Sequence, residues 1–477
     1  MEPNWILQRS FLTPNRVGLR FGEESWTFQQ LHHISMQYAR KLTTIGLKPF
    51  DRVAIIGVST PTLVHIIYGC MQLQIEIVFL NNRLSKAELA YQLEDAEVRL
   101  LLADDQFSDL FEERDMCLFS ELQQVEEDRS FEAAKEWSAN QTISIMYTSG
   151  TTGFPKGVRQ TVENHRMSAL GSILNIGLDE RDTWLCMVPI FHISGFSILM
   201  RSLLYGMTVA LYEKFDEVAV AKEIAAGTIT HYSVVAVMLE RILTYMESNG
   251  LVADERFKLA LAGGGPIPVA FLERAQKLQM AVAQTYGMTE TSSQTCTLSA
   301  SDALTKIGSA GKPLFFYQVR IDGTNLPNEV GEICVRGPHV TPGYIGRHAN
   351  LASQQDGWLH TGDLGFLDEE GYLFVVDRRS DLIISGGENV YPAQIENVLL
   401  AHPAVSEAGV CGIPHEKWGQ VPVAFVVKKS DVSEEELLAF CREQLAKYKV
   451  PQTVKFVAQL PRNGANKLMR RKLIQLL

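Results

Sequence analysis

A loop rich in glycine, serine and threonine follows a short hydrophobic segment, in a pattern typical of phosphate binding. It reads Tyr147-Thr-Ser-Gly-Thr-Thr-Gly-Phe-Pro-Lys-Gly157. Glycines let backbone N–H groups approach a polyphosphate, the hydroxyls add donors, and the lysine adds positive charge. Such residues also favour exposed turns, but their unbroken run after a strand favours phosphate binding. The predicted phosphate contacts are Thr148, Ser149, Gly150, Thr151, Thr152, Gly153 and Lys156.

The loop departs from the Walker A pattern of P-loop NTPases. That pattern places lysine after its last glycine and before a serine or threonine, whereas Lys156 precedes Gly157. The sequence therefore excludes the P-loop NTPase class.

Three later segments carry groups that could bind the rest of a nucleotide. Tyr286-Gly-Met-Thr-Glu-Thr291 offers Glu290, and Mg²⁺ prefers oxygen ligands from one or two carboxylates together with phosphate. The other two are Thr361-Gly-Asp363 and Gly263-Gly-Gly-Pro266. Each has an ordinary alternative, respectively a strand end with a helix cap, a hairpin turn and a strand-to-helix turn. Their significance depends on their occurring together.

Three single residues are also candidates, and each has a simpler explanation. His192 follows an apolar segment, where a histidine is more often a buried core residue. Arg378 alone would be a surface charge, and Lys467 a solvated side chain near the end of the sequence. Lys467 could nevertheless offset charge in a transition state if a small C-terminal domain closes over the first domain.

In chain order these segments resemble the signature motifs of the adenylate-forming superfamily, which includes acyl-CoA and aryl-CoA ligases, luciferases and peptide-synthetase adenylation domains. The resemblance implies that a carboxylate attacks ATP, giving an acyl-adenylate and pyrophosphate, and that the coenzyme A thiol then displaces AMP. Mg²⁺ is the implied cofactor, held by Glu290 and Thr152. The implied catalytic residues are Lys467, His192, Lys156 and Arg378. Further nucleotide contacts are implied for Gly263, Gly264, Gly265, Tyr286, Gly287, Met288, Thr289, Asp363, Arg378 and Lys467.

The same resemblance implies that the small domain rotates between the two steps. Ser380 aligns with the hinge, and Gly386, Gly387 and Glu388 align with the strand that lines the path of coenzyme A. Many relatives carry aspartate or lysine at the hinge. Serine is small enough to absorb the change in φ and ψ, so we expect the rotation to be retained.

Within the superfamily, the chain most resembles the o-succinylbenzoate–CoA ligases of menaquinone biosynthesis. The likeness includes the segments Pro3-Asn-Trp, Phe191-His-Ile-Ser-Gly, Met288-Thr-Glu-Thr-Ser-Ser-Gln294 and Arg378-Arg-Ser-Asp. An aromatic acid with two carboxylates needs a mostly apolar pocket with a few polar groups. The implied substrate contacts are His192, Ser194, Gly264, Ser292 and Gln294. The last two have an alternative as a helix N-terminus that satisfies its own donors.

Other functions stay open at this point. Within the superfamily, the alternative is another aryl-CoA or medium-chain acyl-CoA ligase. From a different class, the chain could be a nucleotide-binding protein that kept the fold and lost the chemistry. The presence of Lys467, Glu290 and Asp363 argues against that second alternative.

The elements that must position these residues follow an α/β pattern. Short β-rich runs alternate with helix-length stretches from about residue 50 to 290, which predicts a large sheet domain. The runs that predict strands are 53–57, 143–148, 184–190, 208–212, 230–235, 259–262 and 281–286. After residue 300, close-set strands predict an antiparallel, barrel-like subdomain near 300–376. A compact α+β pattern follows, with a helix opening at Pro392, strands near 405–411 and 422–428, and a capping box at Ser433 and Glu436. We expect an N-terminal domain at 1–379 and a mobile C-terminal domain at 380–477.

Composition limits the range of partners. The 477 residues are 46% hydrophobic and carry a net charge of −11, which argues against nucleic acid or an anionic membrane as a general partner. No apolar stretch is long enough to span a membrane, because the segment from Phe196 to Tyr212 is interrupted by Arg201. The seven cysteines show no metal-type spacing, and a reducing, cytoplasmic setting is expected. Small-molecule substrates are the expected partners, and a homodimer stays open.

Overall fold

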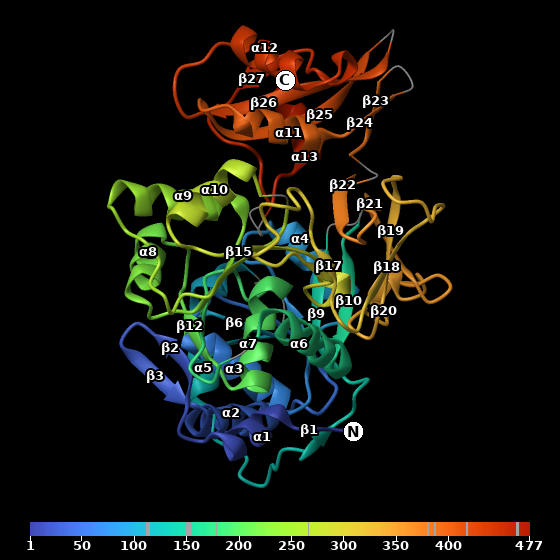
Figure 1. Cartoon of the computed structure of the whole chain (residues 1–477). Coiled ribbons are helices and arrows are strands. Elements are labelled where there is room, and N and C mark those ends of the chain that lie inside the picture. Colours follow the sequence, from blue (N-terminus) through green and yellow to red (C-terminus); the bar gives the residue numbers. More distant parts are fainter. Residues whose placement is uncertain are drawn as a thin grey trace.

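The computed structural model consists of a large N-terminal domain and a small C-terminal domain, with the two chain ends at opposite ends of the molecule (Figure 1). The expected α/β class is thereby confirmed. The described residues are 1–110, 115–148, 154–177, 179–265, 267–378, 381–385, 388–415, 418–463 and 467–477, and the side chains of Arg378 and Asn389 are also outside the description. The predicted boundary at Ser380 lies outside these residues and stays a prediction.

The first sheet of the N-terminal domain has seven strands in the order β20-β10-β9-β5-β4-β6-β7. Five neighbouring strands, β9 to β7, are parallel and lie between helices. Val53 and Ile55 face one core, whereas Ala54 and Ile56 face another, as the two-residue period of a strand requires. The strands are β4 (Arg52–Ile56), β5 (Glu76–Phe79), β6 (Leu100–Ala103), β7 (Met116–Leu118), β9 (Thr142–Thr148), β10 (Lys156–Thr161) and β20 (Gly343–Tyr344).

The second sheet has nine strands in the order β17-β16-β15-β14-β13-β11-β12-β2-β3. The six from β15 to β2 are parallel, and antiparallel pairs extend both edges. The strands are β2 (Val17–Phe21), β3 (Glu24–Thr27), β11 (Thr183–Cys186), β12 (Thr208–Leu211), β13 (His231–Val234), β14 (Leu259–Ala262), β15 (Val282–Tyr286), β16 (Cys296–Thr297) and β17 (Lys312–Pro313).

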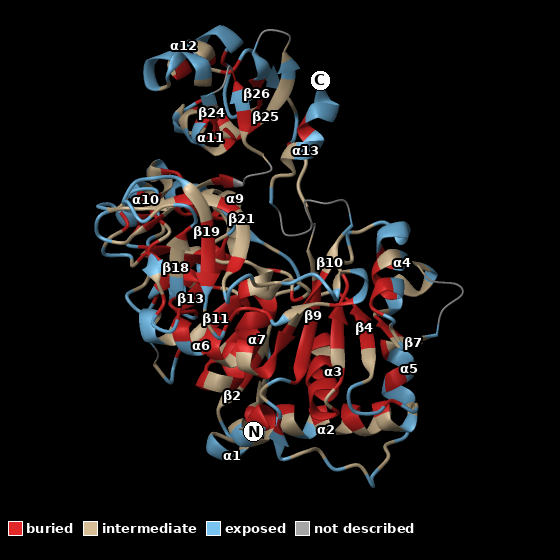
Figure 2. Cartoon of the chain, turned by 90° about the vertical axis from the view of Figure 1, so that its right-hand side faces the viewer, coloured by how far each residue is buried: buried red, intermediate tan, exposed pale blue. Residues whose placement is uncertain are grey.

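Helices α6 (Val162–Ile176) and α7 (Ile193–Tyr205) lie between the two sheets (Figure 2). Phe196 of α7 packs against Phe79 of the first sheet, with ring centroids 4.8 Å apart. Arg201 of the same helix lies over Trp184 of the second sheet, 5.0 Å from its ring centroid. Because α7 is covered on both sides, ten of its thirteen residues are buried.

Other helices of the N-terminal domain cover the outer faces of the sheets. Side chains cap several of them, as for α2, where Thr27 and Gln30 form a capping box. These helices are α1 (Trp5–Leu12), α2 (Phe28–Thr44), α3 (Pro61–Gln72), α4 (Lys86–Asp95), α5 (Phe119–Gln124), α8 (Glu217–Ala226), α9 (Ala236–Ser248) and α10 (Val269–Lys277). Shorter elements are β1 (Glu2–Pro3), β8 (Glu136–Trp137), η1 (Asp105–Leu110), η2 (Thr289–Thr291) and η3 (Gly346–His348).

A separate sheet of four strands follows in the order β18-β19-β21-β22, and every pair in it is antiparallel. The antiparallel strands predicted for this segment are therefore present. These four strands do not close on themselves among the described residues. Instead, Leu373 of β22 hydrogen-bonds to the backbone of Ala310 and Gly311, next to β17 of the second sheet. Two extended hairpins can form an open sheet when the neighbouring domain core covers one face. The strands are β18 (Gln318–Ile321), β19 (Gly331–Arg336), β21 (Leu359–Leu367) and β22 (Leu373–Arg378).

The C-terminal domain folds around its own cores, which include Val410, Val426 and Leu437 on one side of its sheet and Phe425 on the other. The sheet order is β24-β23-β26-β25, with β27 beside β26. The predicted helix at Pro392 and the capping box at Ser433 are both present. Its elements are β23 (Ile383–Ser385), β24 (Glu388–Val390), α11 (Pro392–Ala401), β25 (Val405–His415), β26 (Gly419–Lys428), α12 (Glu434–Gln444), η4 (Lys447–Lys449), β27 (Val454–Phe456), α13 (Arg470–Leu473) and η5 (Ile474–Leu476).

Some strand ends differ from those that the sequence predicts. The strand expected from Trp184 to Ile190 stops at Cys186, shortly before Pro189, which has no N–H to donate to a ladder. The strands expected near 405–411 and 422–428 extend to a hairpin of eleven and ten residues. Among the described residues, no helix is both long and apolar enough to cross a membrane.

Candidate active site

The loop after β9 and the turn after β15 meet at one edge of the N-terminal domain. Thr148 ends β9, and its hydroxyl donates to Glu290 Oε1 at 3.4 Å, although 142 residues separate the two. Lys156 begins β10 directly opposite Thr148 in the antiparallel register. The predicted contacts Ser149, Gly150, Thr151, Thr152 and Gly153 lie outside the described residues. The described ends of the loop therefore place a hydroxyl and an ammonium group near a carboxylate.

Tyr344 of β20 connects Lys156 to Glu290. The Lys156 ammonium lies 5.3 Å from the centroid of the Tyr344 ring. Burial, followed by the charge of Glu290, raises the pKa of the Tyr344 hydroxyl. The sequence reasoning missed Tyr344, because it lies almost 200 residues from the loop in a two-residue strand.

Tyr286 and Asp363 meet although 77 residues separate them. The buried Tyr286 hydroxyl donates to Asp363 Oδ2 at 2.8 Å, and burial, followed by the Asp363 charge, raises the pKa of Tyr286. Asp363 pairs with Arg378 across the β21–β22 ladder. The end of the second sheet thus adjoins the antiparallel sheet where the predicted ribose contacts lie.

The turn that carries Glu290 is held in place by its backbone. Gln160 Nε2 donates to the Thr289 carbonyl at 2.8 Å, and the N–H of Thr341 donates to the Glu290 carbonyl at 2.8 Å. A Cβ atom at Gly287 would come within 1.6 Å of the Ser293 carbonyl oxygen. Only glycine fits there, so the turn after Met288 can fold back tightly against β15.

Lys467 of the C-terminal domain reaches the N-terminal domain at Gly264. A Cβ atom built on Gly264 would lie 3.2 Å from Lys467 Cε and 3.4 Å from Val235 Cγ1. Gly264 has φ of +83°, a conformation that glycine adopts without strain. Gly263 and Gly265 flank it after β14, whereas Pro266 is outside the described residues. The structure therefore brings the predicted C-terminal lysine to the predicted glycine turn.

His192 and Ser194 lie at the N-terminus of α7. The His192 ring is partly buried beside Phe191, with centroids 4.7 Å apart, and Ser194 is exposed. His192 is the N-cap residue without a side-chain cap hydrogen bond. Its side chain therefore takes no part in capping α7.

Ser292 and Gln294 follow the 3₁₀ turn η2 and do not begin a helix, so the expected alternative of a helix N-terminus is wrong. Both side chains are buried. Gln294 Oε1 accepts from Arg201 Nη2 at 2.9 Å, and Ser293 Oγ accepts from the same nitrogen at 3.2 Å. The buried Ser292 hydroxyl has no hydrogen-bond partner among the residues that the structure describes.

Arg201 is a buried cation that the sequence reasoning treated only as an interruption of an apolar segment. It is 2% exposed, and the described partners of its guanidinium are the neutral Ser293, Gln294 and Tyr205 side chains and the Trp184 ring. Its buried Nε atom has no hydrogen-bond partner among the described residues, and burial lowers its pKa. A buried charge is costly unless it is paired, so a lone arginine in an apolar helix was the signal that could have identified it.

Arg470 joins the two sides of the predicted hinge. Its guanidinium donates to both oxygens of Glu396, at 2.8 and 2.6 Å, and to Asp377 Oδ1 at 2.8 Å and Asp381 Oδ2 at 3.3 Å. Burial alone would lower the pKa of Arg470, but these carboxylates raise it. Asp377 precedes Ser380, whereas Asp381 and Glu396 follow it.

Two of the three predicted coenzyme A path residues, Gly386 and Gly387, lie outside the described residues, as does Ser380. Glu388 begins β24 and is exposed. A second ionic contact between the domains joins Lys429 to Glu240 at 3.8 Å.

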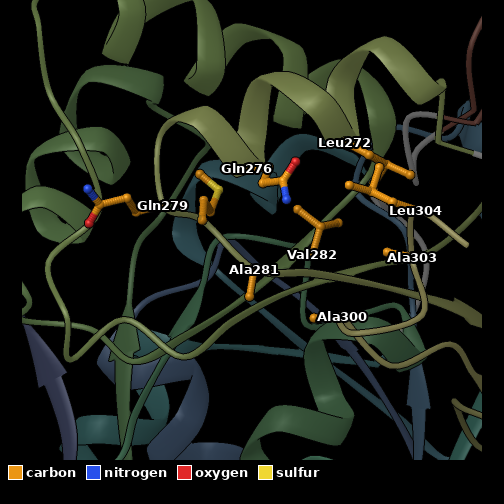
Figure 3. A pocket seen from close by; sticks show the side chains of 9 residues that line it. Leu272, Gln276, Gln279, Ala281, Val282, Ala300, Ala303 and Leu304 are labelled. Carbon is orange, nitrogen blue, oxygen red and sulfur yellow. The ribbon is translucent and has the colours of Figure 1, made fainter.

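A cavity of about 250 Å³ lies between the end of α10 and the segment at 300–304 (Figure 3). Leu272, Val282 and Leu304 give it an apolar lining, with Gln276 and Gln279 at its edge. Its described lining includes none of the predicted site residues, so the site described above is a separate place.

An α/β core that presents hydroxyl, carboxylate and ammonium groups at the ends of its strands, together with a C-terminal lysine, defines a nucleotide-binding enzyme of two domains. Comparison with models of known protein families identifies the family to which the two domains belong. Residues 8–345 match the model of the AMP-binding enzyme family, and residues 394–467 match that of the AMP-binding enzyme C-terminal domain. This chain belongs to the AMP-binding enzyme family.

Full-length relatives are similar to both domains. A 2-succinylbenzoate–CoA ligase of Bacillus mycoides (strain KBAB4) is 49% identical, over 99% of this chain and 98% of that protein. The o-succinylbenzoate CoA synthetase of Bacillus subtilis is 43% identical. Its structures with the acyl-adenylate intermediate and with ATP and a magnesium ion both have a TM-score of 0.93, covering 99% of this chain and 98% and 99% of those chains.

A third structure of the Bacillus subtilis enzyme is less similar. It is a double mutant bound to the product analogue OSB-NCoA, with the same 43% identity and coverage of 99% and 98%, yet the TM-score is 0.77. Because the enzyme and the coverage are nearly the same, the lower score reflects a different conformation of that protein.

Proposed function

We propose that this protein is an o-succinylbenzoate–CoA ligase that forms an acyl-adenylate from ATP and then a coenzyme A thioester. The observation that carries the proposal is the approach of Lys467 to Gly264. It brings the C-terminal domain to the site where Thr148, Glu290 and the Tyr286–Asp363 pair converge. Relatives of that activity match both domains over 99% of the chain.

The groups at this site fit a magnesium nucleotide. Glu290 supplies a hard carboxylate oxygen close to the Thr148 hydroxyl, as Mg²⁺ requires, and Thr152 is the second proposed ligand. When bound, Mg²⁺ neutralises negative charge on the phosphate oxygens. Tyr286 stacks on adenine, Thr289 contacts the α-phosphate, and Asp363 and Arg378 bind the ribose hydroxyls. Lys156 and the loop donors bind the outer phosphates.

In the first step, an oxygen of the substrate carboxylate attacks the α-phosphorus of ATP. A C–O–P link forms and the bond to pyrophosphate breaks. Lys467 lies between carboxylate and α-phosphate and stabilises the charge that develops there. No general base is needed, because a carboxylic acid is ionised at neutral pH. His192 holds the acyl group in position at the start of α7.

In the second step, the coenzyme A thiol attacks the acyl carbon, a C–S bond forms and AMP leaves. We propose that the C-terminal domain rotates about Ser380 before this step, withdrawing Lys467 and bringing Gly386, Gly387 and Glu388 to the path of coenzyme A. The orientation seen here suits adenylation. The TM-score of 0.93 to adenylate and ATP complexes against 0.77 to a product-analogue complex supports that reading.

Arg201 is the proposed partner of the carboxylate that is not activated. It lies nine residues after His192, buried in α7, and its hydrogen-bond partners among the described residues are the neutral Ser293, Gln294 and Tyr205 side chains. A carboxylate with its aromatic ring in an apolar pocket would compensate this charge.

A panel of acids tests the substrate. With ATP, Mg²⁺ and coenzyme A, pyrophosphate release should be far faster with o-succinylbenzoate than with coumarate, benzoate or medium-chain fatty acids. Preference for a fatty acid would favour another acyl-CoA ligase of this family. Nucleotide binding without pyrophosphate release from any acid would favour the inactive nucleotide-binding alternative.

A cytoplasmic location and a homodimer are proposals of lesser scope. All seven cysteines are free thiols, which suits a reducing compartment. Sedimentation of the purified protein would test the homodimer, and a single species at the monomer mass would contradict it.

A further inference from the structure

One face of the antiparallel sheet gathers side chains with no place in the proposed reaction. Cys334 of β19 lies directly opposite His360 of β21 and opposite Arg320 of β18. Asp322 follows β18, two residues after Arg320, and Glu332 is the second residue of β19, two residues before Cys334. Residues two apart in a strand point to the same face. The sheet therefore collects a thiol, an imidazole and two carboxylates from three strands.

Asp322, Cys334 and His360 lie close enough together to share a metal ion, and Glu332 lies beside His360. Cys334 Sγ lies 3.4 Å from His360 Nδ1, and His360 Nδ1 lies 3.4 Å from Glu332 Oε2. The ligand atoms of Asp322, Cys334 and His360 all lie within 4.8 Å of one another. Zinc bonds of about 2.3 Å to sulfur and about 2.1 Å to nitrogen or oxygen place tetrahedral ligands about 3.4–3.5 Å apart. Hydrogen bonds between nitrogen and oxygen are shorter, near 2.9 Å.

The local charge also favours a cation. Two carboxylates adjoin the thiol, and burial, followed by the charges of Asp322 and Glu332, raises the pKa of Cys334 to about 11. The nearby cation is Arg320, which lies 3.7 Å from Asp322 and over the Trp358 ring at 4.6 Å, and whose hydrogen bond and charge act to lower the pKa of Cys334, so it competes with a metal ion for this place. Its side chain is 43% exposed, so it can turn into solvent. Glu332 is held in place by the N–H of Gly362, which donates to Oε1 at 2.9 Å.

We propose that Cys334, His360 and Asp322 form a binding site for Zn²⁺ on this sheet, with Glu332 beside His360 and a fourth ligand position open to water. Thiolate, imidazole and carboxylate together are a ligand set that zinc prefers. On binding, the Cys334 thiol gives its proton to solvent and the sulfur bonds the metal. The metal joins β18, β19 and β21. It thereby braces the strand that carries Asp363, three residues after His360.

Cobalt binding to the metal-free, full-length protein tests the site without any activity measurement. Co²⁺ should bind in one equivalent with a thiolate-to-cobalt absorption band and the intense visible bands of tetrahedral cobalt, and Zn²⁺ should displace it. Cys334→Ser and His360→Gln should each abolish the thiolate band or weaken binding more than about 100-fold, since even substitutions outside the ligand shell cost 10–100-fold.

Two matched variants complete the test. Cys411→Ser removes a partly exposed thiol of the other domain and should leave the cobalt spectrum unchanged. Arg320→Ala removes the competing cation and should tighten binding. An octahedral spectrum in the wild-type protein, or a thiolate band that persists in Cys334→Ser, would overturn the proposal. Because the readout is metal binding, failure here leaves the proposed ligase function untouched.

Discussion

The N-terminal and C-terminal domains contribute to one site through different kinds of contact. In the N-terminal domain, Thr148 and Tyr286 end buried strands whose neighbours fix them on both sides. The C-terminal domain arrives through polar groups, with Lys467 beside Gly264 and Lys429 beside Glu240. Apolar packing is difficult to exchange, whereas ionic contacts in water exchange at low cost. This difference indicates that the nucleotide-binding groups keep fixed positions in the N-terminal domain, whereas Lys467 can leave the site when the C-terminal domain moves.

The largest effect is expected from removing Lys467, the group that the mobile C-terminal domain contributes to the site. Lys467→Ala should slow acyl-adenylate formation by about 10²–10³-fold, as for the loss of one group that stabilises transition-state charge. Thioester formation from supplied acyl-adenylate should remain near wild-type. Pyrophosphate release and thioester formation measured separately check this, and equal damage to both steps would contradict the assignment.

A second test concerns the fixed part of the site. Arg201→Leu should lower kcat/KM for o-succinylbenzoate by about 10–100-fold, the range for losing a hydrogen bond to a charged group. Benzoate, which lacks a second carboxylate, should be affected by only a few-fold. Arg201→Lys is the matched control and should recover part of the loss. Equal losses with both acids would instead indicate that Arg201 serves packing of α7.

The hinge region should give a smaller effect. Asp377→Asn removes the charge that Arg470 meets on the N-terminal side, while both oxygens of Glu396 still bind the guanidinium. The adenylation orientation should lose stability, and the adenylation rate should fall by about tenfold, equivalent to about 1.4 kcal/mol. Thioester formation from acyl-adenylate should be unchanged or faster. Parallel losses in both half-reactions would rule out an orientation-specific role.

The smallest effect is expected at the outer ionic contact. Glu240→Gln removes the partner of Lys429, whose side chain is half exposed. Exposed pairs contribute up to about 1 kcal/mol, so the balance between the two half-reactions should change by less than about fivefold. The change should vanish at 1 M salt, where screening acts over about 3 Å. A change that persists at high salt would show that Glu240 acts by other means.

Most of the elements that carry the site could be predicted from the sequence. Buried strands appear there as short runs of β-branched residues bounded by residues that favour turns. β4, β9, β13, β14 and β15 lie within a residue or two of their expected positions. The open form of the four-stranded sheet was not predictable, since closure depends on which face the neighbouring domain covers. The pattern of residues within each strand does not encode how the outer strands of the sheet are placed relative to the rest of the domain.

The candidate site was predictable only in part. Motif residues such as Glu290 and Asp363 were identified because each sits beside glycine or threonine in a short, ordered segment. Arg201 and Tyr344 carry no such local signal, and their significance arises from burial and from contacts with segments over 50 residues away. The Cys334–His360 pair was missed for the same reason, since cross-strand neighbours leave no spacing pattern in the sequence.

The distribution of free thiols makes the domain rotation directly measurable. Five of the seven cysteines are buried, whereas Cys117 of β7 and Cys411 of β25 are partly exposed, one in each domain. Burial raises the pKa of both thiols to about 11, so spin labels should attach more readily at mildly alkaline pH. The distance between labels at these two native positions would then report which half-reaction the enzyme is poised to perform.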